Sequence, residues 1–130
     1  HDRLVLNKWF GVQISAAQPQ DAVAVATRLT QHPDFEWKNP NRFRSVIGAL
    51  TGNQAGFHRA DGAGYDFVAD WLIKLDPVNP QTTARMVAGF DSMRRWDDAR
   101  RAKMRSALTR IKDTPGLSRD TSEMVTRLLS

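Results

Sequence analysis

The stretch at residues 39–65, NPNRFRSVIGALTGNQAGFHRADGAGY, has the least generic pattern in the chain, and its opening is echoed at residues 79–90, NPQTTARMVAGF. In each, Asn-Pro precedes an arginine and then apolar residues at helical spacing. Asparagine can accept a hydrogen bond from a free amide of the first helical turn, and proline at the first helical position needs no donor. Each Asn-Pro therefore predicts a helix start. The two starts are 79 − 39 = 40 residues apart, a separation in the range of HEAT-like helical repeats.

The remainder of the chain predicts more helices and no strand. Apolar residues recur at helical spacing over seven segments, at about 2–15, 19–31, 40–52, 65–75, 80–95, 98–112 and 118–129. The sixth helix is expected to be capped by Asp97 or Asp98, and the seventh by Ser118. Trp9 is expected on the buried side of the first helix. The longest expected loop covers residues 53–64. The predicted fold is all-α, with antiparallel helix pairs stacked as a short HEAT-like superhelix of about seven helices.

Length and composition narrow the class of protein. The 130 residues, 41% hydrophobic, are enough for one core, so residues 1–130 are expected to form a single domain. The chain has no cysteine, which favours a reducing, cytoplasmic setting. No apolar run reaches the roughly 18 residues of a membrane span, and no signal peptide is evident. A start at His-Asp-Arg, without methionine, is typical of a piece of a longer polypeptide.

The chain is basic, with 19 Lys and Arg against 14 Asp and Glu. Eight of the basic residues fall within residues 94–112, and such a cluster can bind nucleic acid. However, these residues surround all of the predicted helix except its apolar stripe, which is typical of a solvated helix. The solvated surface is the favoured interpretation, and no nucleic-acid partner is expected.

The histidines lack the spacing of a metal site. A zinc hydrolase needs clustered ligands, for example two histidines four residues apart on one helix. His1, His32 and His58 are far apart, so no metal is expected in this chain. His32, before a proline, is expected to interact with carbonyls at a helix end.

The loop after the first Asn-Pro helix offers a possible nucleophile. Thr51, His58 and Asp61 flank one loop, but no nucleophile-elbow pattern surrounds the hydroxyl. The favoured alternative is structural: Phe57 and Tyr65 fill the core, while Asp61 and His58 hold the loop backbone by hydrogen bonds.

Arg44 and Arg85 are the candidate binding residues. Each is about one turn into an Asn-Pro helix, in corresponding places of the two units. A structural interpretation gives them local ion pairs, for example between Arg44 and Asp34 or Glu36. The functional alternative is that both line the concave side of the helix stack and bind a carboxylate, which the planar guanidinium can hold with two donors.

Several motifs together resemble one known family. They are LVLNKWF from residue 4, QHPDF from residue 31, NPNRFRS from residue 39, FHRADGAGY from residue 57 and NPQ from residue 79. Their order and distances resemble the carboxy-terminal end of the bacterial aminopeptidase N family, zinc aminopeptidases of the gluzincin clan. The similarity extends from Leu4 to Leu129, although the loop at residues 51–56 and the pair Arg59–Ala60 depart from the usual pattern.

The resemblance implies that catalysis and enclosure of the active site belong to different domains of the enzyme. In this family the zinc-binding HEXXH motif and the GAMEN motif belong to an earlier catalytic domain, so this chain alone is expected to be inactive, with no catalytic residue of its own. Its implied role is a carboxy-terminal α-helical domain that encloses the active-site cavity and helps bind the peptide. Arg44 and Arg85 match family positions that face the cavity. The implied partners are the catalytic domain of the same polypeptide and peptide substrates, and zinc is the cofactor of the parent enzyme.

Two other classes remain open from the residues themselves. One is a basic helical module that binds nucleic acid through residues 94–112. The other is a scaffold for other proteins, which predicts an exposed apolar patch.

Overall fold

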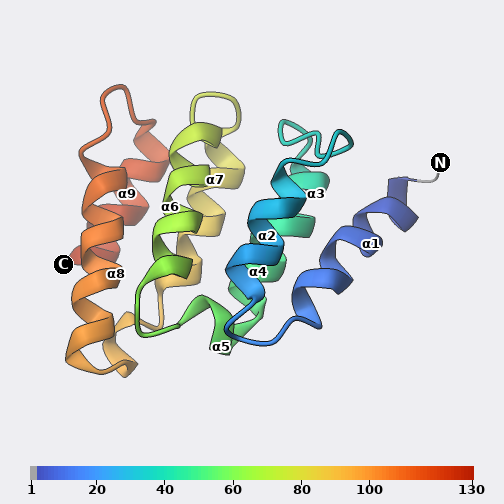
Figure 1. Cartoon of the computed structure of the whole chain (residues 1–130). Coiled ribbons are helices and arrows are strands. Elements are labelled where there is room, and N and C mark those ends of the chain that lie inside the picture. The colour runs from blue at the N-terminus through green and yellow to red at the C-terminus, as the bar shows by residue number, and fades with distance from the viewer. Residues whose placement is uncertain (1–2) are drawn as a thin grey trace. The chain divides into compact units, whose positions relative to one another are not determined.

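The computed structural model describes residues 3–130, and every regular element in this range is a helix (Figure 1). The elements are α1 (Arg3–Ser15), α2 (Ala22–Thr30), α3 (Pro40–Phe43), the π-helix η1 (Arg44–Gly48), α4 (Ala49–Gly52), α5 (Gln54–Phe57), α6 (Ala63–Leu75), α7 (Pro80–Val87), the 3-10 helices η2 (Ala88–Phe90) and η3 (Met93–Arg95), α8 (Asp98–Lys112) and α9 (Arg119–Leu129). The all-α prediction is confirmed. No helix in residues 3–130 is long and apolar enough to cross a membrane.

The chain divides into two compact units, residues 1–59 and residues 60–130. Each contains one Asn-Pro helix and is described below by itself. A single domain over residues 1–130 remains a prediction.

In the first unit, α1 and α2 both pack against the continuous helix made by α3, η1 and α4. The Asn39 side chain accepts a hydrogen bond from the backbone N–H of Arg42 at 3.1 Å, which confirms the predicted cap. Gly11 lets α1 approach η1 closely, because a Cβ at this position would lie 3.3 Å from the carbonyl oxygen of Ser45. The sequence signal for a helix start therefore begins the central helix of this unit.

A buried arginine joins three segments of the first unit. Only 4% of Arg42 is exposed. Its guanidinium donates to the side-chain oxygen of Asn7 in α1 and to the carbonyl of Asp34, and it lies 5.4 Å from the ring centre of Phe10. A buried guanidinium is tolerated only when its donors are satisfied. These contacts therefore hold α1 and the segment before α3 against the helix that carries Arg42.

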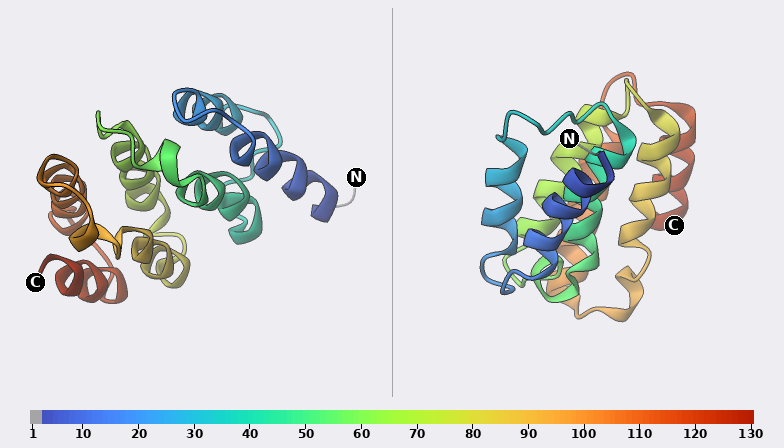
Figure 2. Two further views of the ribbon diagram at one scale, coloured as in Figure 1. Left: turned by 90° about the horizontal axis from the view of Figure 1, so that it is seen from below. Right: turned by 90° about the vertical axis from the view of Figure 1, so that its right-hand side faces the viewer.

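In the second unit, α8 lies beside α6 and α9 beside α7, and α8 and α9 also pack on each other (Figures 1 and 2). The Asn79 side chain accepts from the backbone N–H of Thr82 at 3.0 Å, and Pro80 is the first residue of α7. Asp97 and Ser118 cap α8 and α9 in the same way, by accepting from the backbone N–H of the third residue on. These caps were all expected from local sequence.

The turn after α6 contains a buried carboxylate. Asp76, 2% exposed, accepts hydrogen bonds from the Ser118 backbone N–H and hydroxyl, both at 2.7 Å, and from the Thr121 hydroxyl at 2.6 Å. Charge-assisted bonds of this kind are about twice as strong as neutral ones. Asp76 therefore fastens the end of α6 to the start of α9.

All seven predicted helices are present, but the structure differs from the prediction in the loop at residues 53–64 and at the end of the helix that begins at Pro80. The expected loop at residues 53–64 contains the short helix α5, because Asn53 caps it by accepting from the Gly56 N–H at 3.1 Å. The helix expected to reach residue 95 ends at Val87, tightens into η2 and is followed by η3. Gly89, a weak helix former, lies at this break.

The predicted burial of Trp9 is also wrong. Trp9 is 44% exposed, whereas Phe10 and Ile14 are fully buried. Apolar residues occur on two faces of α1, and only the Phe10 and Ile14 face packs against the rest of the unit. Helical spacing alone did not distinguish these two faces.

Replacing Asp76 by alanine tests the buried carboxylate. We expect Asp76→Ala to reduce the free energy of unfolding by about 2–4 kcal/mol, because it removes three hydrogen bonds and leaves the buried Thr121 hydroxyl and the partly buried donors of Ser118 without this partner. Denaturant unfolding of the polypeptide that carries this chain measures the change. Asp91→Ala removes an exposed carboxylate and is expected to change stability by less than about 0.5 kcal/mol. Equal effects of the two changes would contradict the assigned role.

Candidate functional site

Arg44, the first predicted binding residue, is exposed at the start of the π-helix η1. Its guanidinium donates to the side-chain oxygen of Asn41 at 2.6 Å, so its partner is one turn back rather than the expected Asp34 or Glu36. A π segment holds one more residue per hydrogen-bonded turn than an α-helix, and such segments are frequent at functional sites. The Arg44 side chain is therefore exposed to solvent, and because its partner Asn41 is neutral, its positive charge is not compensated.

Arg85, the second predicted residue, is exposed on α7 and lines a pocket of about 280 Å³. Gln81 and Ala84 of α7 share this pocket with four residues of α9: Asp120, Glu123, Met124 and Arg127. Within residues 3–130, the guanidinium groups of Arg85 and Arg127 make no hydrogen bond or ion pair. The pocket therefore offers two free guanidinium groups beside the carboxylates of Asp120 and of Glu123, which accepts a hydrogen bond from Arg119 at 3.0 Å.

The expectation that Arg44 and Arg85 hold corresponding places needs a correction of one residue. Arg44 is five residues after its capping asparagine, and Arg85 is six after its own. The buried positions do correspond, since Ile47 and Val87 both lie eight residues after the cap. One residue turns a side chain by about 100° around a helix, so the arginines project in different directions from their helices. They also belong to different compact units.

The sequence interpretation missed the contribution of α9 to the pocket around Arg85. The sequence patterns described above identify none of Asp120, Glu123 and Arg127 as a binding residue. Their spacing of three and four residues puts all three on one helix face, a signal that was available in the sequence. That this face adjoins α7 required the packing of the helices.

The described residues contain no group of three or more His, Asp or Glu side chains that could hold a metal ion. His1 lies outside these residues. His32 accepts a hydrogen bond at Nδ1 from the Asp34 backbone N–H at 3.0 Å, so it interacts with an amide rather than with the expected carbonyls. His58 is buried, with its ring 4.8 Å from that of Phe57. The residues that the structure describes therefore do not form a zinc site.

The possible nucleophile has a structural role. The Thr51 hydroxyl donates to the Gly48 carbonyl at 2.8 Å. Asp61 accepts from the Ala63 N–H at 3.0 Å, which confirms its predicted role in holding the loop. Phe57 and Tyr65 are both fully buried, as expected, and burial raises the pKa of Tyr65 to about 12.

Most of the basic segment at residues 94–112 is engaged in contacts within the second unit. Arg100 and Arg101 pair with Asp97 and Asp98, and the hydrogen bond from Arg100 holds the pKa of Asp97 below its ordinary value. Arg110 reaches Asp70 at 2.8 Å. Backbone carbonyls accept from three others: Arg94, Lys103 and Arg105. This pattern agrees with the solvated-helix interpretation.

Comparison with known proteins defines the class to which this helical architecture belongs. The class is that of ARM-repeat proteins, in which helical units stack on one another. The family described as "Domain of unknown function (DUF3458_C) ARM repeats" matches residues 1–130, and the chain belongs to this family.

Similar proteins carry aminopeptidase names. The chain is 43% identical over 127 residues to aminopeptidase N of Caulobacter vibrioides and 42% identical over 129 residues to aminopeptidase N of Escherichia coli. These matches cover 97% and 98% of this chain but only 15% of each relative. A crystal structure of Legionella pneumophila aminopeptidase A in complex with aspartic acid has a TM-score of 0.88 and 34% identity, over 95% of this chain and 14% of that one.

Proposed function

We propose that this chain is the carboxy-terminal helical part of a zinc-dependent aminopeptidase N, where it encloses the active-site cavity and helps bind the peptide. The supporting observation is the coverage: nearly all of this chain matches about one seventh of aminopeptidase N relatives at about 40% identity. A part of this size, without a metal-binding cluster among its described residues, is suited to shape a cavity rather than to cleave a bond.

Catalysis and zinc belong, in this proposal, to a domain of the same polypeptide outside these 130 residues. When bound there, zinc would supply a Lewis acid and an activated water for hydrolysis of the first peptide bond. The catalytic domain is the proposed partner, and the amino-terminal residues of peptides are the proposed products. We place the enzyme in the cytoplasm, in line with the absence of cysteine.

Arg44 and Arg85 are the proposed peptide-binding residues of this part. Both are exposed, and each lies on a helix anchored by an asparagine cap. The Arg85 guanidinium has no partner within residues 3–130, so a peptide carboxylate would not displace an existing ion pair. Asp120 and Glu123, in the same pocket, can accept hydrogen bonds from peptide amides or an ammonium group.

The activity of the full-length polypeptide tests the proposed function. We expect it to release the amino-terminal residue from short peptides and amino-acyl amides, to lose this activity when a chelator removes the metal, and to regain it when zinc is restored. Amino-acyl amide hydrolysis before and after chelation measures this. Activity that persists without metal, or no release of amino-terminal residues, would contradict the proposal.

Substitution of the two arginines in the full-length enzyme tests their role. We expect Arg44→Ala and Arg85→Ala each to weaken binding of peptides with a free carboxylate about 10- to 100-fold, because a hydrogen bond to a charged group contributes about 1.5–3 kcal/mol. Amino-acyl amides, which lack the carboxylate, should be cleaved as before. Steady-state kinetics on both substrate types measure the difference.

Two further variants make the arginine test specific. Arg28→Ala removes an exposed arginine of α2 and should leave both substrates unaffected. Arg85→Lys keeps the charge but loses the planar fork, so we expect a partial loss. An equal loss for peptides and amides would show that Arg44 and Arg85 are structural.

A further inference from the structure

The pocket between α7 and α9 separates its charges along the two helices. Both helices begin side by side and run in the same direction (Figure 1), since Asp76, in the turn before α7, is bonded to Ser118, the cap of α9. Asp120 and Glu123 come early in α9, whereas Arg127 comes about two turns after Asp120. The pocket is therefore negative near the helix starts and positive further along.

Arg127 lacks the partner that its own helix offers. Glu123 lies four residues before Arg127, which is the more favourable order for an ion pair on one helix. The Glu123 carboxylate instead accepts a hydrogen bond from Nε of Arg119 at 3.0 Å. The guanidinium groups of Arg127 and of Arg85 therefore line one pocket without a partner in residues 3–130. Like charges repel each other, and an anion between them would relieve this repulsion.

The two arginines lie at similar levels along their helices. Arg85 is five residues beyond the first residue of α7, and Arg127 is eight residues beyond the first residue of α9. At 1.5 Å of rise per residue, their levels differ by about 4–5 Å if the two helix starts are level. One small anion with acceptors on both sides can span this difference.

A carboxylate suits this position better than a phosphate group. It has two oxygens in one plane, so a guanidinium on either side can donate to it. A phosphate monoester carries a charge of about −1.5 to −2, and the carboxylates of Asp120 and Glu123 in the same pocket would repel it more strongly. Those two carboxylates can also accept hydrogen bonds from the backbone N–H groups of a peptide that extends toward the helix starts.

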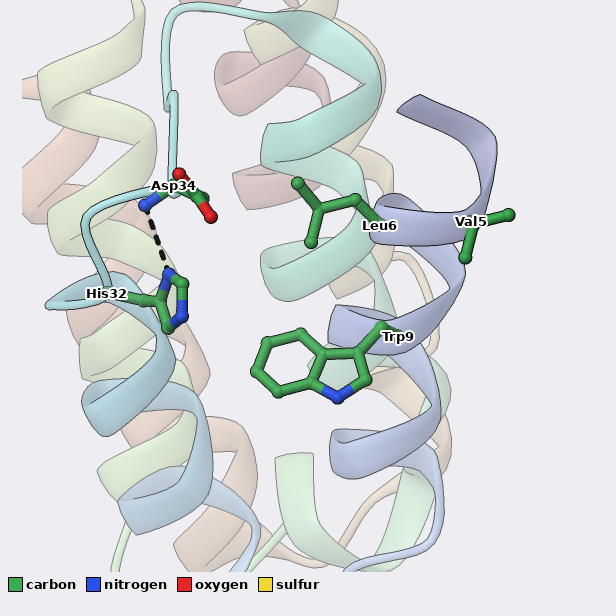
Figure 3. A pocket seen from close by; sticks show the side chains of 5 residues that line it. All are labelled: Val5, Leu6, Trp9, His32 and Asp34. Atoms are coloured by element: carbon green, nitrogen blue, oxygen red, sulfur yellow. Dashed lines mark hydrogen bonds between the residues drawn. The ribbon is translucent and has the colours of Figure 1, made fainter. Parts of the chain in front are cut away.

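The hollow of about 310 Å³ beside α1 has a different chemistry (Figure 3). Its lining combines the apolar side chains of Val5, Leu6 and Trp9 with His32 and Asp34, and the His32 ring accepts a hydrogen bond from the Asp34 backbone N–H. Neither arginine nor lysine occurs among these five lining residues. A carboxylate is therefore better accommodated between α7 and α9.

We propose that Arg127 determines substrate specificity together with Arg85, by holding a carboxylate of the peptide between the two guanidinium groups. The carboxylate is that of the last residue of the peptide or that of an acidic side chain. This inference rests on the proposed function in taking peptides as the ligands, and it adds a residue of α9 to the site on α7.

Titration calorimetry of the full-length polypeptide tests the inference. The probe is tetra-alanine with its first peptide bond reduced to a methylene-amine, which cannot be hydrolysed. We expect Arg127→Ala to weaken binding of this probe about 10- to 100-fold, and to change binding of its carboxy-terminal amide less than about twofold. Arg127→Lys keeps the charge without the planar fork and should give a partial loss. Lys112→Ala removes an exposed charge of α8 away from this pocket and should affect neither probe.

A third probe identifies the source of the carboxylate. It is Ala-Ala-Ala-Asp amide with the same reduced bond, which has a carboxylate only on its side chain. A loss with tetra-alanine assigns the pocket to the end of the peptide, and a loss with the third probe alone assigns it to an acidic side chain.

Two outcomes would overturn the inference. One is an equal loss for tetra-alanine and its amide, which would make Arg127 structural. The other is unchanged binding of all three probes by Arg127→Ala. Calorimetry records binding without hydrolysis, so a protein that binds the probe through Arg127 but releases no amino-terminal residue would contradict the proposed function alone.

Discussion

Two asparagine side chains determine where the central helices of this chain begin. Asn39 and Asn79 each accept a hydrogen bond from the third residue of the helix that follows, and a proline sets the backbone of the first turn. This start fixes the register of what comes after it: Ile47 and Val87, eight residues beyond the caps, are both fully buried. In each unit, the Asn-Pro start therefore sets which face of the helix after it is buried.

The features that the sequence predicted well are those governed by neighbouring residues. The caps at Asn39, Asn79, Asp97 and Ser118 and the absence of strands in residues 3–130 follow from interactions within four or five positions. The cap at Asn53 was not predicted although its acceptor bond from the Gly56 N–H is local; only the bonds that its amide donates to the carbonyls of Ile14 and Ala17 are distant in sequence. The roles of Asp76 and Arg42 were not predicted because their partners are distant along the chain.

The candidate site was predicted only in part. Arg44 and Arg85 were selected from the Asn-Pro echo, and both are exposed. Their different distances from the caps, and the contribution of Asp120, Glu123 and Arg127 to the surroundings of Arg85, depend on helix register and on packing between α7 and α9. The orientation of α1 was not predicted correctly because both of its sides are apolar, and spacing does not say which side packs against the unit.

The proposed account makes this chain a helical part of a longer aminopeptidase whose catalytic groups lie outside these residues, and it rests on the match of nearly all of the chain to 15% of each aminopeptidase N relative. The size and metal content of the native polypeptide test this most directly. Intact mass and elemental analysis of the protein purified from its source should give about 14.7/0.15, or roughly 98 kDa, with zinc bound. A native polypeptide of 14.7 kDa, or a longer one that holds no metal, would contradict the account.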